Sequence, residues 1–156
     1  MDAMDTYVSH FENLTPPLSP NDIEVSIYKD LIGDSSDVLL LGYTKELLFL
    51  ATTAVDLSYT GTNPKVKIGN WFDIVERHDV IIGDGVLNLA GDKLLGHLLG
   101  LCKCMLIIRF FTKKLKGMRY ATYFRGNMSP LIPPPDLVFK TQESCEILVW
   151  RNLKKF

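Results

Sequence analysis

The chain has 156 residues, of which 47% are hydrophobic and 22% charged, and this is the composition of one globular domain with a sizeable core. Seventeen basic and eighteen acidic residues leave a formal charge of −1, so no global field attracts nucleic acid or an anionic membrane. We therefore expect no membrane partner, and a nucleic acid is disfavoured, although the basic cluster from Lys113 to Arg119 keeps it open as an alternative.

The amino terminus and the cysteines bear on the cellular compartment. Met1–Asp5 is acidic where a secretory signal is basic, and no apolar stretch approaches the roughly 20 residues that span a bilayer. The cysteines, Cys102, Cys104 and Cys145, cannot all pair with each other and lack the spacing of a zinc site. We expect a cytoplasmic protein with buried free thiols and no metal.

The first segment is predicted to be an arm rather than part of the body. Residues 1–18 contain no regular apolar pattern and are expected to be loosely structured. Tyr7 and Phe11 are its possible anchors, either on the body of the protein or over a cleft. Packing alone explains these two aromatic residues adequately.

The first helix is predicted directly after this arm. Residues 19–22, Ser-Pro-Asn-Asp, are typical of a helix start, with the serine as the cap and the acid near the positive end of the dipole. Ile23, Ile27 and Leu31 follow at spacings of four, which places them on one face. Gly33 can end the helix in a left-handed turn.

Four short apolar runs come next, and each ends in a glycine or a polar residue. The first is Val38–Leu41, and the others lie within residues 54–56, 66–71 and 79–85. Residues 44–51 are predicted to form a helix of about two turns that is capped by Thr44. Residues 57–65 are polar and too few for the usual helical crossover between parallel strands, so we expect an irregular connection there.

An apolar helix and a central strand are predicted in the C-terminal half. Residues 86–101 are rich in leucine and are expected to pack against the sheet, although they contain three glycines. Residues 104–111 are almost continuously apolar, which is typical of a parallel strand covered on both faces. The basic run that follows is interpreted as a solvated loop or helix face. It consists of Lys113, Lys114, Lys116 and Arg119.

A stiff loop and a hairpin complete the predicted fold. Pro130 and residues 133–135, all prolines, are incompatible with a helix interior. Residues 137–140 and 146–150 can pair as a terminal hairpin. The whole pattern predicts a single domain over residues 1–156, with the core over 19–111 and the loop and hairpin over 112–156. The fold class is α/β, a Rossmann-like three-layer sandwich with a mostly parallel sheet, a C-terminal antiparallel hairpin and shortened connections.

The ends of the four apolar runs are predicted to form one ligand cleft, because open parallel sheets bind ligands outside the carboxyl ends of their strands. Gly42 lets the backbone approach a ligand, and the helix expected from Thr44 offers amide groups to a carboxylate. Asp56 is placed to accept hydrogen bonds from a ribose diol. Asn70 and Trp71 can contact an adenine, and Asp84 can meet an ammonium group.

Each of these residues also has a purely structural interpretation. Gly42 can be an ordinary turn glycine, and Asp56 can bind the amides of Ser58 or Tyr59 in a local turn. Trp71 can be a packing residue. Asp84 can be a turn acid or a helix cap. The order of the four junctions along the chain favours the ligand cleft more than any single residue does.

That order resembles the class I S-adenosylmethionine-dependent methyltransferases. The segments that carry the resemblance are Leu-Leu-Leu-Gly-Tyr-Thr-Lys-Glu-Leu (39–47), Ala-Val-Asp-Leu-Ser (54–58), Gly-Asn-Trp-Phe (69–72) and Asp-Val-Ile-Ile-Gly-Asp-Gly-Val-Leu-Asn (79–88). The chain looks most like a bacterial branch with a Leu-Gly-x-Thr-x-Glu-Leu first loop. The resemblance covers residues 16–111. It departs from the family's pattern in the single first-loop glycine, in Asn70 where the branch has an acid, and in the short connection after Asp56.

The resemblance implies S-adenosylmethionine as cofactor. It implies that the first loop lies beside the methionine part, that Asp56 holds the ribose, that Asn70 and Trp71 hold the adenine, and that Asp84 lies near the sulfonium. The complete expected cofactor-binding set is Gly42, Tyr43, Thr44, Asp56, Leu57, Asn70, Trp71, Asp84 and Gly85.

The sequence leaves two candidate functions and disfavours a third. The first is methyl transfer to a small molecule, and the second is a catalytically silent methyltransferase-like binding or regulatory module, either one as a possible homodimer. A nicotinamide-dependent oxidoreductase is disfavoured because residues 42–47 lack two of the three glycines of its motif.

Methyl transfer needs positioning more than acid-base groups, so we assign no general base. His78 and His97 are interpreted as structural. Tyr7 and His10, on the arm, are the residues to test if the arm closes the cleft.

Overall fold

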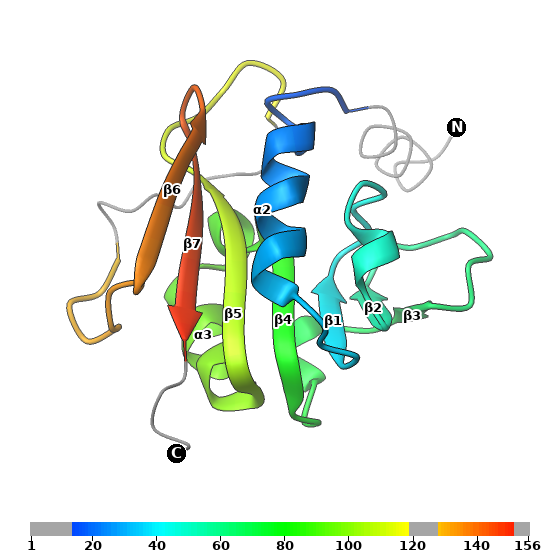
Figure 1. Cartoon of the computed structure of the whole chain (residues 1–156). Coiled ribbons are helices and arrows are strands. Elements are labelled where there is room, and N and C mark those ends of the chain that lie inside the picture. The colour runs from blue at the N-terminus through cyan, green and yellow to red at the C-terminus, as the bar shows by residue number, and fades with distance from the viewer. Residues whose placement is uncertain (1–13, 119–127, 152–156) are drawn as a thin grey trace.

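The computed structural model describes residues 14–118 and 128–151, which build one sheet of seven strands (Figure 1). The strand order is β3-β2-β1-β4-β5-β7-β6. The strands are β1 (Val38–Leu41), β2 (Thr53–Asp56), β3 (Val66–Ile68), β4 (His78–Asp84), β5 (Cys102–Phe111), β6 (Leu137–Gln142) and β7 (Cys145–Arg151). Strands β1 to β5 are parallel, and β7 pairs antiparallel with both β5 and β6. The predicted parallel sheet with a terminal antiparallel hairpin is therefore confirmed.

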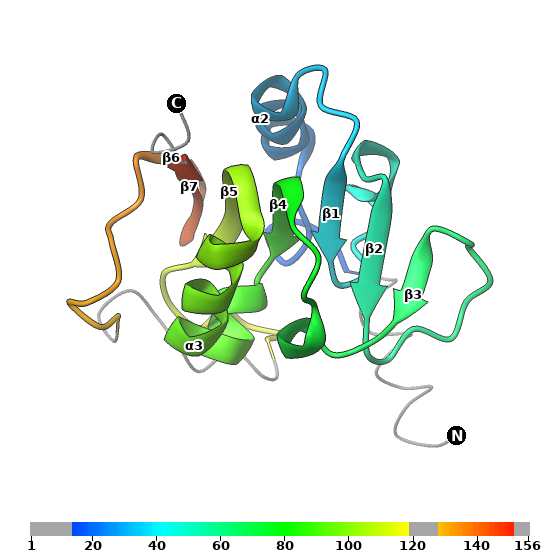
Figure 2. The same cartoon turned by 90° about the horizontal axis from the view of Figure 1, so that it is seen from below.

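Two helices cover opposite faces of this sheet (Figure 2). They are α2 (Asp22–Ile32) and α3 (Val86–Leu101). The strands supply side chains to both faces in alternation, so Leu40 packs on the α2 side while Leu39 and Leu41 pack on the α3 side. All four residues of β1 are buried. The predicted three-layer α/β sandwich is confirmed in this arrangement.

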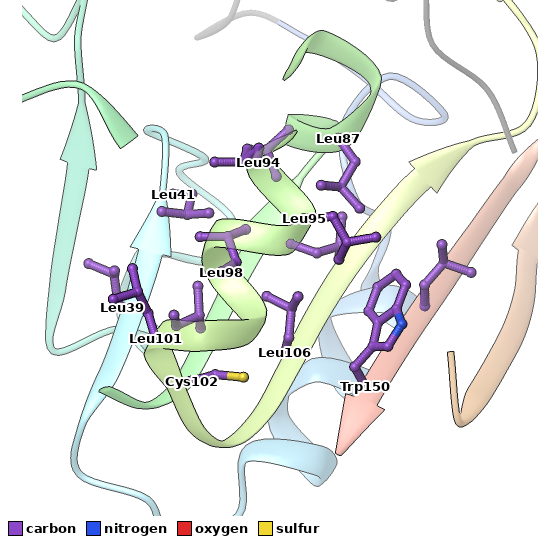
Figure 3. Packing of buried hydrophobic residues seen from close by; sticks show 14 of the residues in the cluster. Leu39, Leu41, Leu87, Leu94, Leu95, Leu98, Leu101, Cys102, Leu106 and Trp150 are labelled. Atoms are coloured by element: carbon purple, nitrogen blue, oxygen red, sulfur yellow. The ribbon is translucent and has the colours of Figure 1, made fainter. Parts of the chain in front are cut away.

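The larger core lies between α3 and the sheet (Figure 3). Leu94, Leu95 and Leu98 of α3 are fully buried against strands β1, β4 and β5. Each large aliphatic side chain buried in this way contributes about 1.5–3 kcal/mol. Asn88 fixes the start of the helix to the end of β5, because its amide donates to the Phe111 carbonyl at 2.9 Å and its oxygen accepts from the Phe111 amide at 3.0 Å.

Helix α2 begins two residues after the predicted start and buries a polar residue as well as apolar ones. Asn21 is the cap in place of Ser19, and it forms a capping box with Glu24. Ile23 is 66% exposed, whereas Glu24, Tyr28 and Ile32 are buried. Ile27 and Leu31 are partly buried against the core as their spacing suggested, but Glu24 also turns inward to a buried arginine, which hydrophobic periodicity cannot indicate.

The helix predicted over residues 44–51 is absent. The chain forms a turn in which the Leu47 amide donates to the Thr44 carbonyl at 3.0 Å, and then a short 3-10 helix, η1 (Leu48–Leu50). Thr52 brings the chain back at once to the start of β1, since its hydroxyl accepts from the Val38 amide at 3.0 Å. Leu47 is fully buried in this tight return, and no room is left for two α-helical turns. The connection over residues 57–65 is irregular, as predicted.

The remaining structural predictions are confirmed in part. Strands β6 and β7 form the expected hairpin. Cys102 and Cys145 are buried free thiols as expected, but Cys104, near the start of β5, is exposed. The lysines of the basic run are exposed, and they are Lys113, Lys114 and Lys116.

Several predicted features lie outside the described residues. They are the arm residues Tyr7, His10 and Phe11, together with Arg119. Within the described ranges, no helix has the length and apolar character that a membrane crossing requires.

Candidate functional site

The carboxyl ends of β1, β2 and β4 and the segment after β3 border one pocket of about 250 Å³. Almost all of the predicted cofactor-binding residues line it, namely Gly42, Tyr43, Thr44, Asp56, Leu57, Asn70, Trp71 and Asp84. The exception is Gly85, which is buried behind Asp84 and donates its amide hydrogen to the Arg109 carbonyl at 2.9 Å. Sequence positions more than forty residues apart therefore meet at a single site.

Gly42 and Trp71 form one wall of the pocket through a shared acceptor. The Gly42 amide and the Trp71 indole Nε1 both donate to the Val55 carbonyl, at 2.8 and 2.9 Å. Gly42 has φ +79°, and a Cβ atom there would lie 3.4 Å from Cζ2 of Trp71. A glycine is favoured here by the backbone angle, while the indole lies at ordinary contact distance from that position. Trp71 is thus a packing residue and a wall of the pocket at once.

Asp56 ties two loops together at the end of β2. Its Oδ2 accepts from the Tyr43 amide at 2.7 Å, and its Oδ1 accepts from the Ser58 amide at 2.8 Å. The local turn to Ser58 is the structural interpretation that the sequence suggested. Each carboxylate oxygen keeps a further lone pair for a hydroxyl group in the pocket, so the local turn and a ribose contact are compatible.

Asn70 and two tyrosines add polar and aromatic groups to the pocket lining. Asn70 caps the short helix η2 (Trp71–Asp73) by accepting from the Phe72 amide at 3.0 Å. Tyr43 and Tyr59 lie with their ring centroids 5.1 Å apart. Tyr59 was missed by sequence reasoning, although an aromatic residue in a short polar connection after Asp56 is a usable signal. Other lining residues that were missed are Leu41, Ser58, Gly69, Val86 and Leu89.

Asp84 forms an ion pair with Arg109, which lies in the strand that the sequence predicted to be apolar. Arg109 Nε donates to Asp84 Oδ1 at 2.6 Å, and its Nη2 donates to Oδ2 at 3.1 Å. The β4–β5 register places these two residues directly opposite each other. The Arg109 side chain is 0% exposed and that of Asp84 is 8% exposed, so the pair is buried. The two parallel hydrogen bonds make it bidentate.

No protein-family model matches the chain, and no curated protein matches it. Several solved structures are similar to the chain in fold. Magnesium protoporphyrin IX methyltransferase from Synechocystis PCC 6803, with bound SAH, aligns with a TM-score of 0.63 at 12% identity over 94% of each chain. The same enzyme with bound SAM aligns with a TM-score of 0.55 at 16% identity, over 95% of this chain and 90% of that one. The fold is that of the class I methyltransferases. Identities this low show the fold alone.

In this methyltransferase fold, Arg109 is the centre of a larger buried cluster. Its guanidinium also contacts the Glu24 carboxylate at 3.4 Å and donates to the carbonyls of Pro17, at 2.7 Å, and Leu18, at 3.0 Å. Glu24 in turn accepts from Thr141 and Gln142 of β6. The cluster therefore joins α2, β4, β5 and the hairpin behind the pocket.

Burial and charge act in opposite directions on the groups of this cluster. Burial raises the pKa of the Asp84 carboxyl, and the adjacent guanidinium opposes that rise. Burial by itself lowers the pKa of Arg109, but Asp84 and Glu24 outweigh it and the net shift is upward. Arg109 therefore stays protonated at all ordinary pH values. Burial also raises the pKa of the Cys145 thiol to about 11, which makes this cysteine a poor nucleophile.

Proposed function

We propose that the pocket binds S-adenosylmethionine and that the protein transfers its methyl group to a small-molecule acceptor. The observation that carries this proposal is the convergence of Gly42, Asp56, Trp71 and Asp84 on one pocket at the carboxyl ends of the strands. The class I methyltransferase fold supports it, because open α/β sheets hold their ligands at this edge.

The residues of the pocket suit the parts of this cofactor to different degrees. Asp56 can accept from the ribose hydroxyls, and Trp71 and Asn70 can contact the adenine. The first loop, Gly42 to Thr44, lies between these residues and Asp84, where the proposal puts the methionine part. The cofactor supplies a methyl group already activated on a sulfonium, so the chain has to position the acceptor and exclude water.

Binding is the first test of this function. Calorimetric titration with S-adenosylmethionine and S-adenosylhomocysteine should give a measurable heat, and both ligands should raise the melting temperature. Asp56→Ala should abolish or strongly weaken both signals, because it removes the ribose acceptor. Asp73→Ala is the matched control, since Asp73 is exposed and does not line the pocket. The absence of heat and of a thermal shift at millimolar ligand would remove the proposal.

The second candidate function is a catalytically silent binding or regulatory module. The small pocket favours it, since about 250 Å³ is below the usual range of about 300–1,000 Å³ for ligand sites. The indole of Trp71 is also held in the pocket wall by a hydrogen bond at 2.9 Å. Transfer of a labelled methyl group from the cofactor to any acceptor in a small-molecule panel would exclude this alternative.

We also propose that the first loop is of the kind found in a bacterial branch of the methyltransferases. We further propose that the protein is a single domain, is located in the cytoplasm and can form a homodimer. No general base is assigned. The arm residues Tyr7 and His10 are the ones to substitute once an acceptor is known.

A further inference from the structure

The pocket is lined by acids and by no base. Asp56 and Asp84 contribute carboxylates to its wall, and none of the described residues that line it is a lysine, an arginine or a histidine. Asp56 accepts from the backbone amides of Tyr43 and Ser58, and no cation pairs with it within residues 14–118 and 128–151. Neutral amides stabilise a carboxylate without cancelling its charge. The lining is therefore negative at Asp56.

The cation that pairs with Asp84 is shared with a second acid. Arg109 holds Asp84 through Nε and Nη2, while its Nη1 lies 3.4 Å from Oε1 of Glu24. The side chains of Arg109 and Glu24 are both 0% exposed. One guanidinium therefore faces two carboxylates where water is excluded. Its remaining partners are neutral groups, namely the carbonyls of Pro17 and Leu18 and the thiol of Cys145.

The hydrogen bonds of this cluster favour the ionised form of both acids. Asp84 accepts from the guanidinium on both of its oxygens. Glu24 accepts from the Asn21 amide at 3.0 Å and from the side chains of Thr141 and Gln142. The guanidinium and the amides offer only hydrogens at these positions, so a proton on either carboxyl would displace a donor. Two negative charges and one positive charge leave the cluster with a net negative charge.

The order of these charges in space decides which sign the ligand meets. Asp84 lines the pocket, whereas Arg109 and Glu24 lie behind it and do not. The nearest charge of the cluster is thus negative, and Glu24 draws on the same guanidinium that would otherwise neutralise Asp84 alone. Charges buried in this way are screened little by salt.

We propose that Glu24 gives the pocket a preference for cationic ligands. By sharing Arg109 it leaves Asp84 incompletely neutralised, so a sulfonium or ammonium centre binds more tightly than a neutral analogue of similar shape. This inference rests on the proposed function in taking the ligand to be S-adenosylmethionine. It adds a residue outside the pocket that selects the charged cofactor over neutral S-adenosylhomocysteine. Glu24 touches no ligand and acts through Arg109, so it is a positioning residue.

The first test compares ligand charges on the unmodified full-length chain. Two cations, S-adenosylmethionine and sinefungin, are titrated calorimetrically beside two neutral analogues, S-adenosylhomocysteine and its sulfoxide. Sinefungin carries an ammonium group in place of the methylsulfonium, and the sulfoxide oxygen controls for the size of the methyl group. Both cations should bind at least about fivefold more tightly than both neutral analogues. Neutral analogues that bind as tightly as the cations would overturn the inference.

A variant assigns the preference to Glu24. Glu24→Gln removes the charge and keeps a residue type that serves in a capping box. It should lower the ratio of the S-adenosylhomocysteine to the S-adenosylmethionine dissociation constant by at least about threefold. Glu143→Gln is the matched control, because Glu143 is 82% exposed and pairs with the exposed Lys113, and it should leave this ratio unchanged.

The outcomes separate this inference from the proposed function. Equal losses for both ligands in Glu24→Gln would show a merely structural role and would overturn the inference. If S-adenosylhomocysteine binds to the unmodified chain as tightly as S-adenosylmethionine does, the inference fails while cofactor binding stands. If none of the four ligands binds, the proposed function and the inference fail together. The comparison on the unmodified chain decides the question if Glu24→Gln does not fold.

Discussion

The two sides of the pocket hold their carboxylates in different ways. On the β1–β2 side, Asp56 is half-buried and bonded to backbone amides close in sequence, at Tyr43 and Ser58. On the β4–β5 side, Asp84 is paired with Arg109, which also reaches Glu24, 85 positions away along the chain. The first arrangement uses backbone donors, whereas the second uses a buried cation and joins the pocket lining to the core. The position of an acid at the end of a strand therefore does not by itself tell which kind of partner holds it.

The largest expected effect comes from breaking the buried side. Arg109→Met leaves the carboxylates of Asp84 and Glu24 buried without their cation, and removing one partner of a buried pair costs about 3–5 kcal/mol. The free energy of unfolding in urea measures the loss. Lys113→Met is the control, because its partner Glu143 is 82% exposed and surface pairs contribute at most about 1 kcal/mol. Equal losses in the two variants would show that Arg109 does not act as a buried ion-pair partner.

A smaller loss is expected from the hydroxyl that links the two strands of the buried side. Tyr28 donates to the Gly83 carbonyl at 2.6 Å and accepts from the Arg109 amide at 2.8 Å. Burial raises the pKa of this phenol well above its ordinary value, so the hydroxyl remains a donor. Tyr28→Phe should cost about 1–3 kcal/mol in urea unfolding, because it leaves a buried acceptor without its donor.

Tyr59→Phe is the matched control for Tyr28. The Tyr59 hydroxyl accepts from the Asn63 amide at 3.0 Å in an exposed turn. Its removal should change the free energy of unfolding by less than 1 kcal/mol, or roughly the lower end of the range for a hydrogen bond. A Tyr28→Phe variant as stable as Tyr59→Phe would mean that the two strands do not depend on the buried hydroxyl.

The β1–β2 side is expected to respond through its backbone. Gly42→Ala should destabilise the protein by about 1 kcal/mol, because alanine is strained at a positive φ. Gly96→Ala has open space around it on α3 and should instead stabilise the helix by about 0.5–1 kcal/mol. Thermal unfolding of both variants checks the opposite signs, and a loss in Gly96→Ala would contradict the helical reading.

The smallest effect on stability is expected at the amino ends of the central strands β1 and β4, opposite the pocket. There the Asp37 carboxylate accepts from the Asp79 amide and lies 2.9 Å from His78. Burial alone raises the pKa of Asp37, but the His78 and Asp79 hydrogen bonds outweigh it and the net shift is downward. A lowered folded-state pKa stabilises the protein above the ordinary carboxyl value and ceases to do so as the pH falls through the folded value.

Melting curves of the unmodified protein and of Asp37→Asn check this pH dependence. The difference in stability should be present at pH 5 to 6 and should shrink as the pH falls below about 4, near the ordinary aspartate pKa. A difference that does not change with pH would show that the ionisation of Asp37 is not linked to folding.

Sequence patterns predicted the sheet and most of the pocket because these depend on local signals. A buried run that ends in Gly42, Asp56 or Asp84 is visible in the chain itself, and the parallel topology brings such ends to one edge. The absent helix after Thr44 and the burial of Glu24 on α2 could not be predicted in this way. Their causes are the return of Thr52 to β1 and the turning of Glu24 toward Arg109, and both depend on tertiary contacts.

Arg109 itself carried a signal that apolar periodicity did not use. A single arginine inside the run Met105–Phe111 requires a buried partner, since an unpaired charge in a central strand is strongly unfavourable. The β4–β5 register then makes Asp84 the expected partner. A charged residue in a buried strand therefore predicts a charged partner on the neighbouring strand, and here this partner is Asp84.

The position of β7 has a consequence for how the chain folds during synthesis. Among the described residues β7 follows β6 in the sequence, yet it lies between β5 and β6 in the sheet. Until its residues leave the ribosome, β5 has an open hydrogen-bonding edge and β6 lacks a neighbour in the described sheet, and such open edges are templates for aggregation. The nascent protein thus depends on residues 145–151 to cover the edge of β5, and a variant truncated before Cys145 would expose that edge.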